Sequence, residues 1–566
     1  MHLGIDFGTS YTKLGYIKNS RFINLAGPGA QIPSLVVYLP NQAKKLYFGK
    51  IAQRLNEPGA TQARFFKLEL KRNPGFRLGE YTLEDIIREY FIFLRDEYVQ
   101  PGGEKIDSVT VSVPNYFGLR ARSILMQAIS ASFAVQEIYL LPEPVAALLG
   151  YNHRQPANYL KGAILCIDIG GGTTDFSFVS LSRSRDEIVM ESQFQIGHDA
   201  FSGSELDRGV LRLILNPLFR MQHSYEIPSP IISEKNLQGA ERYWFNRLMA
   251  TAEEVKIRMS RQNSAYFNIP GFYQEDSLVF SLSAEIFLAQ LDSFFFRLKH
   301  YIIHHVRERA EYLGLYREGR FALDYLLLLG GASQTRGIKE LISDLCPGPE
   351  IICPHDLSFN VVRGLCLWKQ EYMPSAIRVK SIYPFNFYIE KWDGAKAGTV
   401  LQKIPFDTEN LELDIGSRYK IFTFPLHSPY NLANQPDRLK LRIYELAQGD
   451  SRASVQHFMG QDLVLQLDCP EMDSDMVDLY LNLGNSVIEL GEGYKTSPIP
   501  AAKPFAHFFA RQETVLEYLS LYPGSNPELL RDYAGYLQQY HNLAASSNQD
   551  YSILLIFKLL AFLQLL

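Results

Sequence analysis

Two glycine-rich segments of the sequence carry residue types that could bind a phosphate chain. IDFGTS (5–10) and IDIGGGTT (167–174) each place an aspartate after an apolar run, followed by glycine and hydroxyl side chains. Backbone N–H groups of a glycine turn can point together at an anion, and threonine and serine hydroxyls add donors. Asp6 and Asp168 are ligands of the kind that suits magnesium, which keeps several of its waters. Together the segments predict a phosphate site with a divalent cation.

Two further motifs are consistent with a nucleotide. LLLLGGASQ (326–334) runs from an apolar strand through Gly330 and Gly331 into a helix, and its turn would leave room for a flat nucleoside. LPEPVAAL (141–148) starts a helix with Glu143 between two prolines, which would add a third carboxylate to the metal site. Each of these motifs alone also fits an ordinary turn or helix start.

The order of strands and helices indicates how these motifs are positioned. Residues 1–375 alternate short apolar runs with longer amphipathic segments, which is typical of an α/β fold. The two aspartate-glycine segments share one plan, a strand, a glycine turn and a second strand, which predicts two β-hairpins. We therefore predict a duplicated α/β domain with lobes at about 1–155 and about 156–375, whose hairpin tips face each other across a cleft.

The remainder of the chain has a different pattern. Residues 376–500 alternate apolar and polar positions in short segments between turn residues, which predicts a β-rich domain. Residues 501–566 predict a small group of helices that ends in the apolar run 553–566. This run is shorter than the roughly 20 residues that a bilayer crossing needs. It is either a buried terminal helix or one that docks on a partner or a membrane surface.

Composition excludes several classes of protein. The chain has 566 residues, 46% of them hydrophobic, and a formal net charge of -5. These values fit a folded protein without the basic excess that nucleic-acid binding requires. The five cysteines show no CxxC spacing, which argues against a disulfide scaffold or a structural zinc site and favours a reducing compartment. The first residues lack the pattern of a signal peptide. We therefore expect a cytoplasmic protein with no transmembrane span and no nucleic-acid partner.

Taken in order, the motifs resemble those of the seventy-kilodalton heat-shock (DnaK-type) chaperones, within the superfamily of actin, sugar kinases and heat-shock ATPases. FFKLELKR (65–72), VSVPNYFGLRAR (111–122) and GHDAFSGSELD (197–207) are also similar to segments of that family. The resemblance implies a duplicated actin-like (ribonuclease-H-like) two-lobe ATPase domain, followed by a β-sandwich-like domain and a short C-terminal helical segment.

The resemblance also implies roles for individual residues. The chain would bind ATP or ADP with Mg²⁺ and hydrolyse ATP slowly, as water attacks the γ-phosphorus in line. Asp6, Glu143 and Asp168 would hold the ion, largely through water. The catalytic residues would be Lys67, Glu143, Asp168 and Thr173, and the switch between the lobes would involve Pro114 and Arg122. The residues in contact with the nucleotide would be Asp6, Gly8, Thr9, Ser10, Tyr11, Gly170, Gly171, Gly172, Thr173, Glu253, Lys256, Ser260, Gly330, Gly331 and Ala332.

The sequence departs from the family in the residues expected to contact the adenine base and in the linker between the two domains. Ile257 stands where the family has an arginine that stacks on adenine, and Gln334 and Ser358 replace two further polar residues. We expect phosphate and Mg²⁺ binding to survive these changes better than selectivity for adenine. PSAIRVKSIYP (374–384) replaces the acidic-apolar linker, which weakens the expectation that nucleotide state is coupled to peptide release.

We predict a divergent heat-shock-type chaperone that acts in protein folding and the stress response. It would bind unfolded or extended polypeptide segments and work with a co-chaperone or a nucleotide exchange factor. The alternative is a nucleotide-binding interaction protein with weak or no ATPase activity that recruits one dedicated partner. The β-rich domain and the PEP motif argue against a third class, a sugar kinase or an actin-like filament protein.

Overall fold

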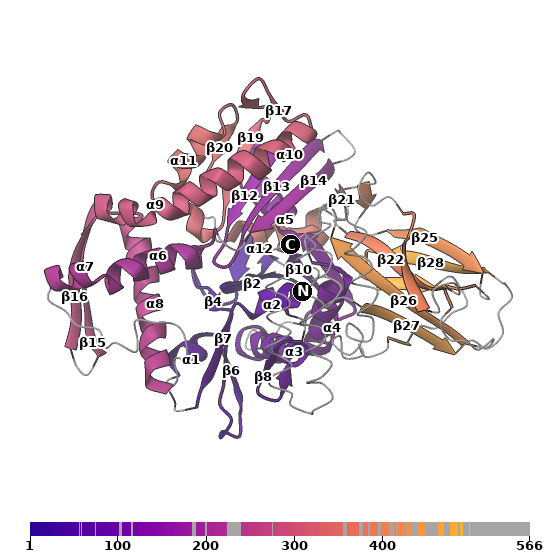
Figure 1. Cartoon of the computed structure of the whole chain (residues 1–566), viewed down its shortest axis with the longest axis horizontal. Helices are drawn as coiled ribbons and strands as arrows, with labels where there is room; N and C mark the ends of the chain where they lie inside the picture. The colour runs from indigo at the N-terminus through magenta and orange to yellow at the C-terminus, as the bar shows by residue number, and fades with distance from the viewer. Residues whose placement is uncertain are drawn as a thin grey trace, which may run out of the picture. The chain divides into compact units, whose positions relative to one another are not determined.

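In the computed structural model the chain divides into two compact units (Figure 1). The first comprises Met1–Arg72, Phe76–Phe117 and Ile124–Ser381, and the second comprises Asn73–Gly75, Gly118–Ser123 and the described residues from Ile382 onward. The structure describes residues 1–498 except 56, 58, 74, 101–102, 104, 115–116, 184–187, 199–200, 224–238, 274–275, 355–358, 373–376, 383–384, 394–397, 407–411, 415–416, 426–427, 432–437, 448–461, 469–475, 485–486 and 491–496.

The first unit contains two large mixed sheets that share one plan. The first sheet consists of β1 (His2–Phe7), β2 (Tyr11–Lys18), β3 (Arg21–Asn24), β4 (Ile32–Pro33), β10 (Ser108–Val113) and β11 (Glu137–Pro142). Its strand order is β11-β10-β1-β2-β3, with β4 beside β2. β1 is antiparallel to β2 and parallel to β10, and all of its residues are buried, as its apolar run predicts.

The second sheet repeats this arrangement. It contains β12 (Gly162–Ile169), β13 (Thr174–Arg183), β14 (Ile188–His198), β19 (Tyr325–Leu329), β20 (Glu350–Ile352) and β21 (Ile377–Ile382), in the order β20-β19-β12-β13-β14-β21. β12 is antiparallel to β13 and parallel to β19, as β1 is to β2 and β10. The hairpins β1–β2 and β12–β13 are therefore equivalent parts of a repeated fold.

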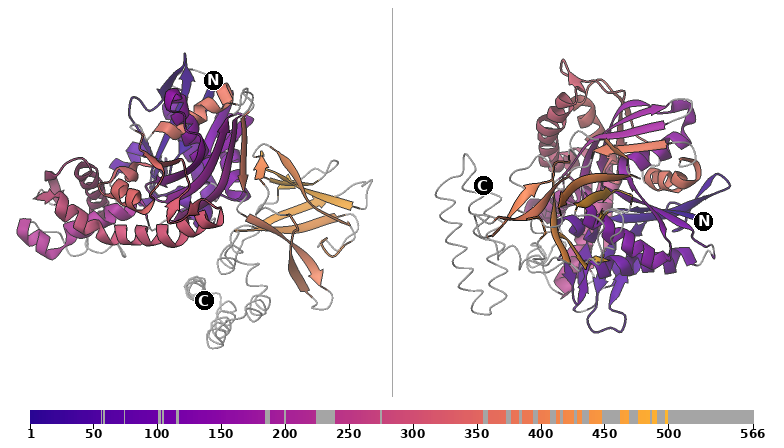
Figure 2. Two further views of the ribbon diagram at one scale, coloured as in Figure 1. Left: turned by 90° about the horizontal axis from the view of Figure 1, so that it is seen from above. Right: turned by 90° about the vertical axis from the view of Figure 1, so that its right-hand side faces the viewer.

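Helices surround these sheets (Figure 2). The described helices are α1 (Gly49–Arg54), α2 (Phe66–Arg72), α3 (Leu83–Leu94), α4 (Leu119–Phe133), α5 (Glu143–Arg154), α6 (Gly203–Leu215), α7 (Pro217–His223), α8 (Gly239–Met259), α9 (Ala284–Tyr301), α10 (Arg307–Tyr312), α11 (Ile338–Leu345) and α12 (Asn360–Leu367). Thr82 begins α3 with a capping box. None of the described helices combines the length and apolar character of a bilayer span.

Four small sheets complete the described part of the first unit. They pair β5 (Leu35–Tyr38) with β6 (Leu46–Phe48) and β7 (Thr61–Arg64), β8 (Arg77–Leu78) with β9 (Tyr81–Thr82), β15 (Ser264–Tyr273) with β16 (Asp276–Ser283), and β17 (Tyr316–Arg317) with β18 (Arg320–Phe321). β7 leads directly into α2 and the segment FFKLELKR, which contains the predicted site residue Lys67.

The second unit is β-rich where it is described. One sheet has the order β23-β22-β26-β27-β30 and another has the order β25-β28-β29; strands of both are labelled in Figure 1. Both sheets contribute side chains such as Phe387, Ile443 and Leu479 to one apolar core. The predicted helices at 501–566, with the apolar run 553–566, lie outside the described residues. The strands are β22 (Phe385–Asp393), β23 (Gly398–Lys403), β24 (Glu412–Asp414), β25 (Arg418–Pro425), β26 (Arg438–Ala447), β27 (Asp462–Asp468), β28 (Met476–Asn482), β29 (Val487–Leu490) and β30 (Ser497–Pro498).

Glycines allow α5 and α12 to pack in backbone contact. A Cβ atom added at Gly150 would lie 2.0 Å from the carbonyl oxygen of Asn360, and one added at Gly364 would lie 1.9 Å from that of Ala146. α12 also packs on β1 and β2. Because α5 begins with Glu143, this crossing holds a predicted site residue at a set distance from the first hairpin.

Gly364→Ala should destabilise the first unit, because the new methyl group would have to separate α5 from α12. Overpacking of this kind costs about 1–3 kcal/mol. Thermal unfolding of the nucleotide-free protein should therefore show a midpoint several degrees below that of wild type. Gly75→Ala is the control, because its Cβ would meet only the Asn73 side chain, at 3.6 Å. An unchanged midpoint for Gly364→Ala would contradict the tight crossing.

Candidate functional site

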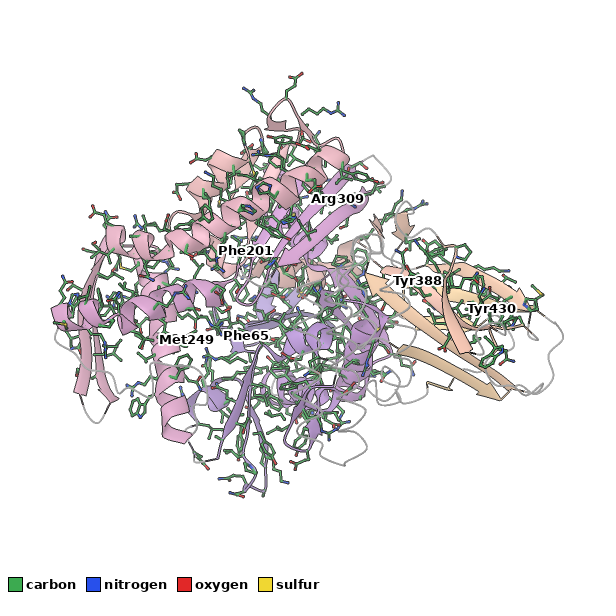
Figure 3. All side chains as sticks on the ribbon, in the orientation of Figure 1. Phe65, Phe201, Met249, Arg309, Tyr388 and Tyr430 are labelled. Atoms are coloured by element: carbon green, nitrogen blue, oxygen red, sulfur yellow. The ribbon has the colours of Figure 1, made fainter. Side chains whose placement is uncertain are left out.

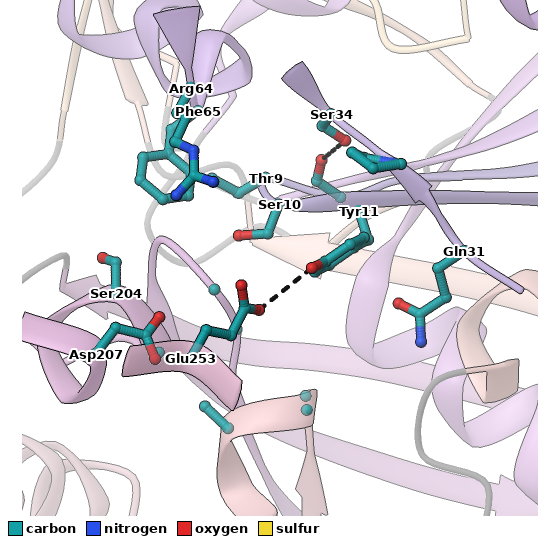
Figure 4. A pocket seen from close by; sticks show the side chains of 18 of the residues that line it. Thr9, Ser10, Tyr11, Gln31, Ser34, Arg64, Phe65, Ser204, Asp207 and Glu253 are labelled. Atoms are coloured by element: carbon teal, nitrogen blue, oxygen red, sulfur yellow. Dashed lines mark hydrogen bonds between the residues drawn. The ribbon is translucent and has the colours of Figure 1, made fainter. Parts of the chain in front are cut away.

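A cleft in the first unit is lined by both hairpin tips (Figure 4). Its volume is about 860 Å³, which suits a ligand of nucleotide size. Residues of α2, α8 and the turn after β19 complete its walls. The predicted site residues that line the cleft are Asp6, Gly8, Thr9, Ser10, Tyr11, Lys67, Pro114, Glu143, Asp168, Gly170, Gly171, Thr173, Glu253, Lys256, Ser260, Gly330, Gly331 and Ala332.

Glycine lets the two hairpin tips touch. A Cβ atom added at Gly171 would lie 1.8 Å from Ser10 Oγ, and one added at Gly172 would lie 2.3 Å from Thr9 Cγ2. Real Cβ atoms do not approach other heavy atoms so closely, so a larger residue at either position would push the tips apart. The geometry brings the two predicted phosphate loops together.

Two predicted residues, Gly172 and Arg122, do not line the cleft. Gly172 faces Thr9 of the opposite tip, and Arg122 is buried within α4 with 8% of its surface exposed. Of the two residues predicted to relay the nucleotide state, Pro114 therefore lines the cleft, whereas Arg122 is buried and does not line it.

Lys67 reaches the cleft because an aromatic cluster anchors the start of α2. The ring of Phe66 lies 5.9 Å from that of Phe7 and 5.2 Å from that of Tyr90. Lys67 donates a hydrogen bond from Nζ to Glu143 Oε1 at 2.8 Å, and its side chain is only 2% exposed. An ammonium group so deeply buried needs its partner, because an unpaired buried charge is costly. Lys67 is therefore not a solvated surface lysine.

A second lysine, Lys13 on β2, enters the cleft beside Asp6. Its Nζ donates to Asp6 Oδ2 at 2.8 Å, and the hydroxyl of Ser112 donates to Asp6 Oδ1 at 3.0 Å. Both carboxylate oxygens of Asp6 thus already accept a hydrogen bond from the chain. The residue expected to help hold Mg²⁺ has its charge balanced by a neighbouring lysine.

Two carboxyl groups of the second hairpin, Asp168 and Asp175, keep their protons to an unusually high pH. Burial raises the pKa of Asp168 to about 8, and the nearby charge of Glu143 adds to the effect. Burial and Glu143 also raise the pKa of Asp175 to about 7, although Thr173 donates a hydrogen bond to it at 3.1 Å. A cation would relieve this repulsion. Within the described ranges, no group of three or more His, Cys, Asp or Glu side chains could hold a metal ion.

The other end of the cleft contains the residues predicted to meet the nucleoside. The hydroxyl of Tyr11 donates to Glu253 Oε1 at 3.2 Å, which joins the first hairpin to α8 (Figure 4). Lys256 Nζ lies 2.7 Å from Asp207 Oδ1 and donates to the carbonyl oxygen of Gly203 at 3.3 Å. Lys256 is therefore already engaged within the second lobe.

The segment that the sequence predicts to contact the base differs from the family pattern in the structure too. Ile257 lines the cleft with 46% of its surface exposed and offers no hydrogen bond. Arg258 turns away, with its guanidinium group 4.4 Å from the centroid of the Phe267 ring. Gln334 lines the cleft, whereas Ser358 lies outside the described residues.

The third glycine motif differs from the expected passage of a strand straight into a helix. β19 is followed by a 3₁₀ turn, Gly331–Gln334, and α11 begins only at Ile338. Gly330 has a φ of 75°, and a Cβ atom there would lie 2.2 Å from the carbonyl oxygen of Ile169. The close approach of β12 therefore requires glycine and turns the chain before the helix can start.

Several residues of the cleft were not predicted from the sequence. They include Lys13, Arg64, Phe65, Asp207 and Asn246, of which Phe65 is labelled in Figure 3. Lys13 follows Tyr11 by two positions on a strand, so strand alternation could have identified it. Phe65 has a φ of 60°, a left-handed conformation that no local pattern indicates for an aromatic residue.

The repeated sheets and the shared cleft define a two-lobe, actin-like fold. Residues 77–347 match the family model described as "Hsp70 protein". The chain is 22% identical over 347 residues to the chaperone protein DnaK of Mycoplasma mycoides subsp. mycoides, covering 61% of this chain and 54% of the relative. It is 25% identical over 353 residues to DnaK of Ureaplasma urealyticum serovar 10, covering 61% and 54%.

A third similar protein is also named a chaperone protein. The chaperone protein HscA of Buchnera aphidicola subsp. Schizaphis graminum is 25% identical over 305 residues, covering 48% of this chain and 46% of the relative. The chain is therefore similar to the Hsp70 family over part of its length, as the resemblance of its motifs predicts. The matched region spans about half the length of these relatives.

The stability of the nucleotide-free protein should fall as the pH rises from about 6 to about 8.5. Asp168 and Asp175 keep their protons to about pH 8 and 7 when folded but lose them near pH 4 when unfolded. The folded state therefore binds more protons in this window, and stability is lost as the pH passes the folded pKa values. Asp168→Asn should make the decrease of stability with pH smaller, and it should stabilise the protein at pH 8 by on the order of 1–3 kcal/mol.

Thermal unfolding across this pH range provides the measurement. Asp292→Asn, which removes an exposed carboxylate on α9, is the control and should keep the wild-type slope. A stability that rises with pH in wild type, or an identical slope in Asp168→Asn, would contradict the assignment.

Proposed function

We propose that the first unit binds ATP or ADP with Mg²⁺ in its cleft and hydrolyses ATP slowly, as part of a divergent chaperone. The main support for this proposal is that the two glycine-rich tips contact each other in the cleft that also contains the ion pair of Lys67 and Glu143. Glycine tips offer backbone N–H groups to a phosphate chain, and the lysine offers a positive charge. Similarity to the chaperone proteins DnaK and HscA supports the same function.

The charged side chains would have separate roles in hydrolysis. The ammonium group of Lys67 would orient the γ-phosphate and the attacking water and offset the charge that develops there. Asp175, which accepts a hydrogen bond from Thr173, would help to position that water. A bound Mg²⁺ would neutralise charge on the phosphates, and Asp168 and Glu143 are the carboxylates that would hold its waters. Catalysis would thus depend on positioning and charge neutralisation.

Lys67→Ala should lower the single-turnover rate of Mg-ATP hydrolysis by at least about 100-fold, because the group that orients the γ-phosphate is lost. Lys71→Ala is the matched control, since Lys71 is an exposed lysine on the same helix, α2, and its removal should preserve the rate. Unfolding midpoints of both variants show whether they fold. Tight binding of Mg-ATP by wild type without turnover would remove the enzymatic part of the proposal and leave nucleotide binding.

Selectivity for adenine should be weak, because Ile257 offers the base neither a hydrogen bond nor a cation to stack on. We expect competition binding to give affinities for ATP and GTP within about tenfold of each other, and Ile257→Arg to raise the preference for ATP severalfold. Arg258→Ala is the control, since this guanidinium group stacks on Phe267. A strong ATP preference in wild type would contradict the expectation.

We also propose that the second unit binds unfolded or extended polypeptide segments, with a co-chaperone or an exchange factor as a further partner. The Hsp70 family match supports this proposal, and so do the two described sheets that share an apolar core. Strand-like main-chain bonds and small apolar pockets are a common way to hold an extended segment. Binding of fluorescent peptides of unrelated sequence to the full chain tests it.

A second candidate function is a nucleotide-held interaction protein that recruits one dedicated partner. The observation that favours it is the weakened nucleoside end of the cleft, where Lys256 pairs with Asp207 and Ile257 faces the space. The same peptide panel separates the two functions. Binding to many unrelated peptides supports a chaperone, whereas binding to none of them, together with capture of one defined partner, supports the interaction protein.

A further inference from the structure

Lys13 lies in the cleft beside Asp6 of the first hairpin. It extends from β2 into the cleft, and its Nζ lies 2.8 Å from Asp6 Oδ2. Its side chain is 15% exposed, so the ammonium group is open to the cleft and largely shielded from bulk water. The pKa of Asp168, on the second hairpin, is raised by burial, and the charge of Lys13 opposes that rise. The lysine is therefore close enough to act on carboxylates from both lobes.

The hydrogen-bonding capacity of Lys13 exceeds what the described part of the chain uses. An ammonium group has three donors, and one of them is directed at Asp6. Asp6 itself receives a second donor from Ser112, so its orientation does not depend on the lysine alone. The remaining protons of Lys13 lie in a cleft lined by Gly8, Thr9 and Gly170, where a phosphate chain would bind.

We propose that Lys13 is a built-in cation of the nucleotide site, which takes over part of the charge neutralisation that otherwise falls to magnesium. This inference rests on the proposed function, because it concerns a polyphosphate bound in the same cleft. A fixed ammonium group attracts a phosphate strongly where water is scarce, and it stays in place when the metal is removed. Nucleotide affinity should therefore depend only modestly on Mg²⁺ as long as Lys13 is present.

A purely structural ion pair would behave differently. If Lys13 served only to hold Asp6 on the neighbouring strand, its loss would lower the unfolding midpoint and leave the effect of Mg²⁺ on nucleotide affinity unchanged. The ratio of affinities with and without the metal is therefore the decisive quantity, because a structural role does not change it.

The experiment measures the affinity of the full chain for ADP by calorimetry, first with Mg²⁺ and then with EDTA. Wild type should lose no more than about tenfold in affinity when the metal is removed. Lys13→Gln, which keeps a donor for Asp6 but has no charge, should lose at least about tenfold more than wild type does. Lys13→Arg should restore the wild-type ratio.

Lys18→Met is the matched control, because Lys18 is an exposed lysine at the end of the same strand and its loss changes the net charge equally. It should keep the wild-type ratio. The same Mg²⁺ dependence in Lys13→Gln and wild type overturns the inference. A loss of about a thousandfold or more in wild type overturns it too, and this holds even if Lys13→Gln does not fold. Absence of ADP binding to wild type in the presence of Mg²⁺ instead overturns the proposed function.

Discussion

The contact between the two glycine-rich hairpin tips is the constraint on which the rest of the site depends. Because an added Cβ at Gly171 would overlap Ser10, the tips can meet only while both keep their small residues. Two sheets of the same plan present these tips, since β1 and β12 each have an aspartate as the last residue but one and are followed by an antiparallel strand. The packing of α5 on α12 then holds Glu143 at the same cleft.

Charge balance is the second constraint, and it follows from the first. Bringing the tips together buries carboxylates near one another, and each must be paired, protonated or neutralised by a ligand. Glu143 is paired with Lys67 and Asp6 with Lys13, whereas Asp168 and Asp175 have raised pKa values. The free protein therefore carries an electrostatic cost that a cation would remove, as expected of a site built for a charged ligand.

The two ends of the cleft have diverged to different degrees from the family pattern. The phosphate end keeps its glycines and carboxylates, whereas at the base end Ile257 lines the cleft and Arg258 stacks on Phe267. Phosphates contribute charge and many hydrogen bonds, and the base contributes selectivity. Under the proposed function, the chain would keep nucleotide binding and lose discrimination between bases. This combination is compatible with a chaperone and also with a protein that uses nucleotide to hold one partner.

The sequence by itself determined the elements whose signals are local. Strand alternation and glycine turns predict both hairpins, and the Thr82 cap predicts the start of α3, because neighbouring residues decide these features. Only the tertiary structure decided that Lys13 pairs with Asp6, that Lys67 pairs with Glu143, and that a 3₁₀ turn precedes α11. These features depend on contacts between separate elements, so no short window of sequence encodes them.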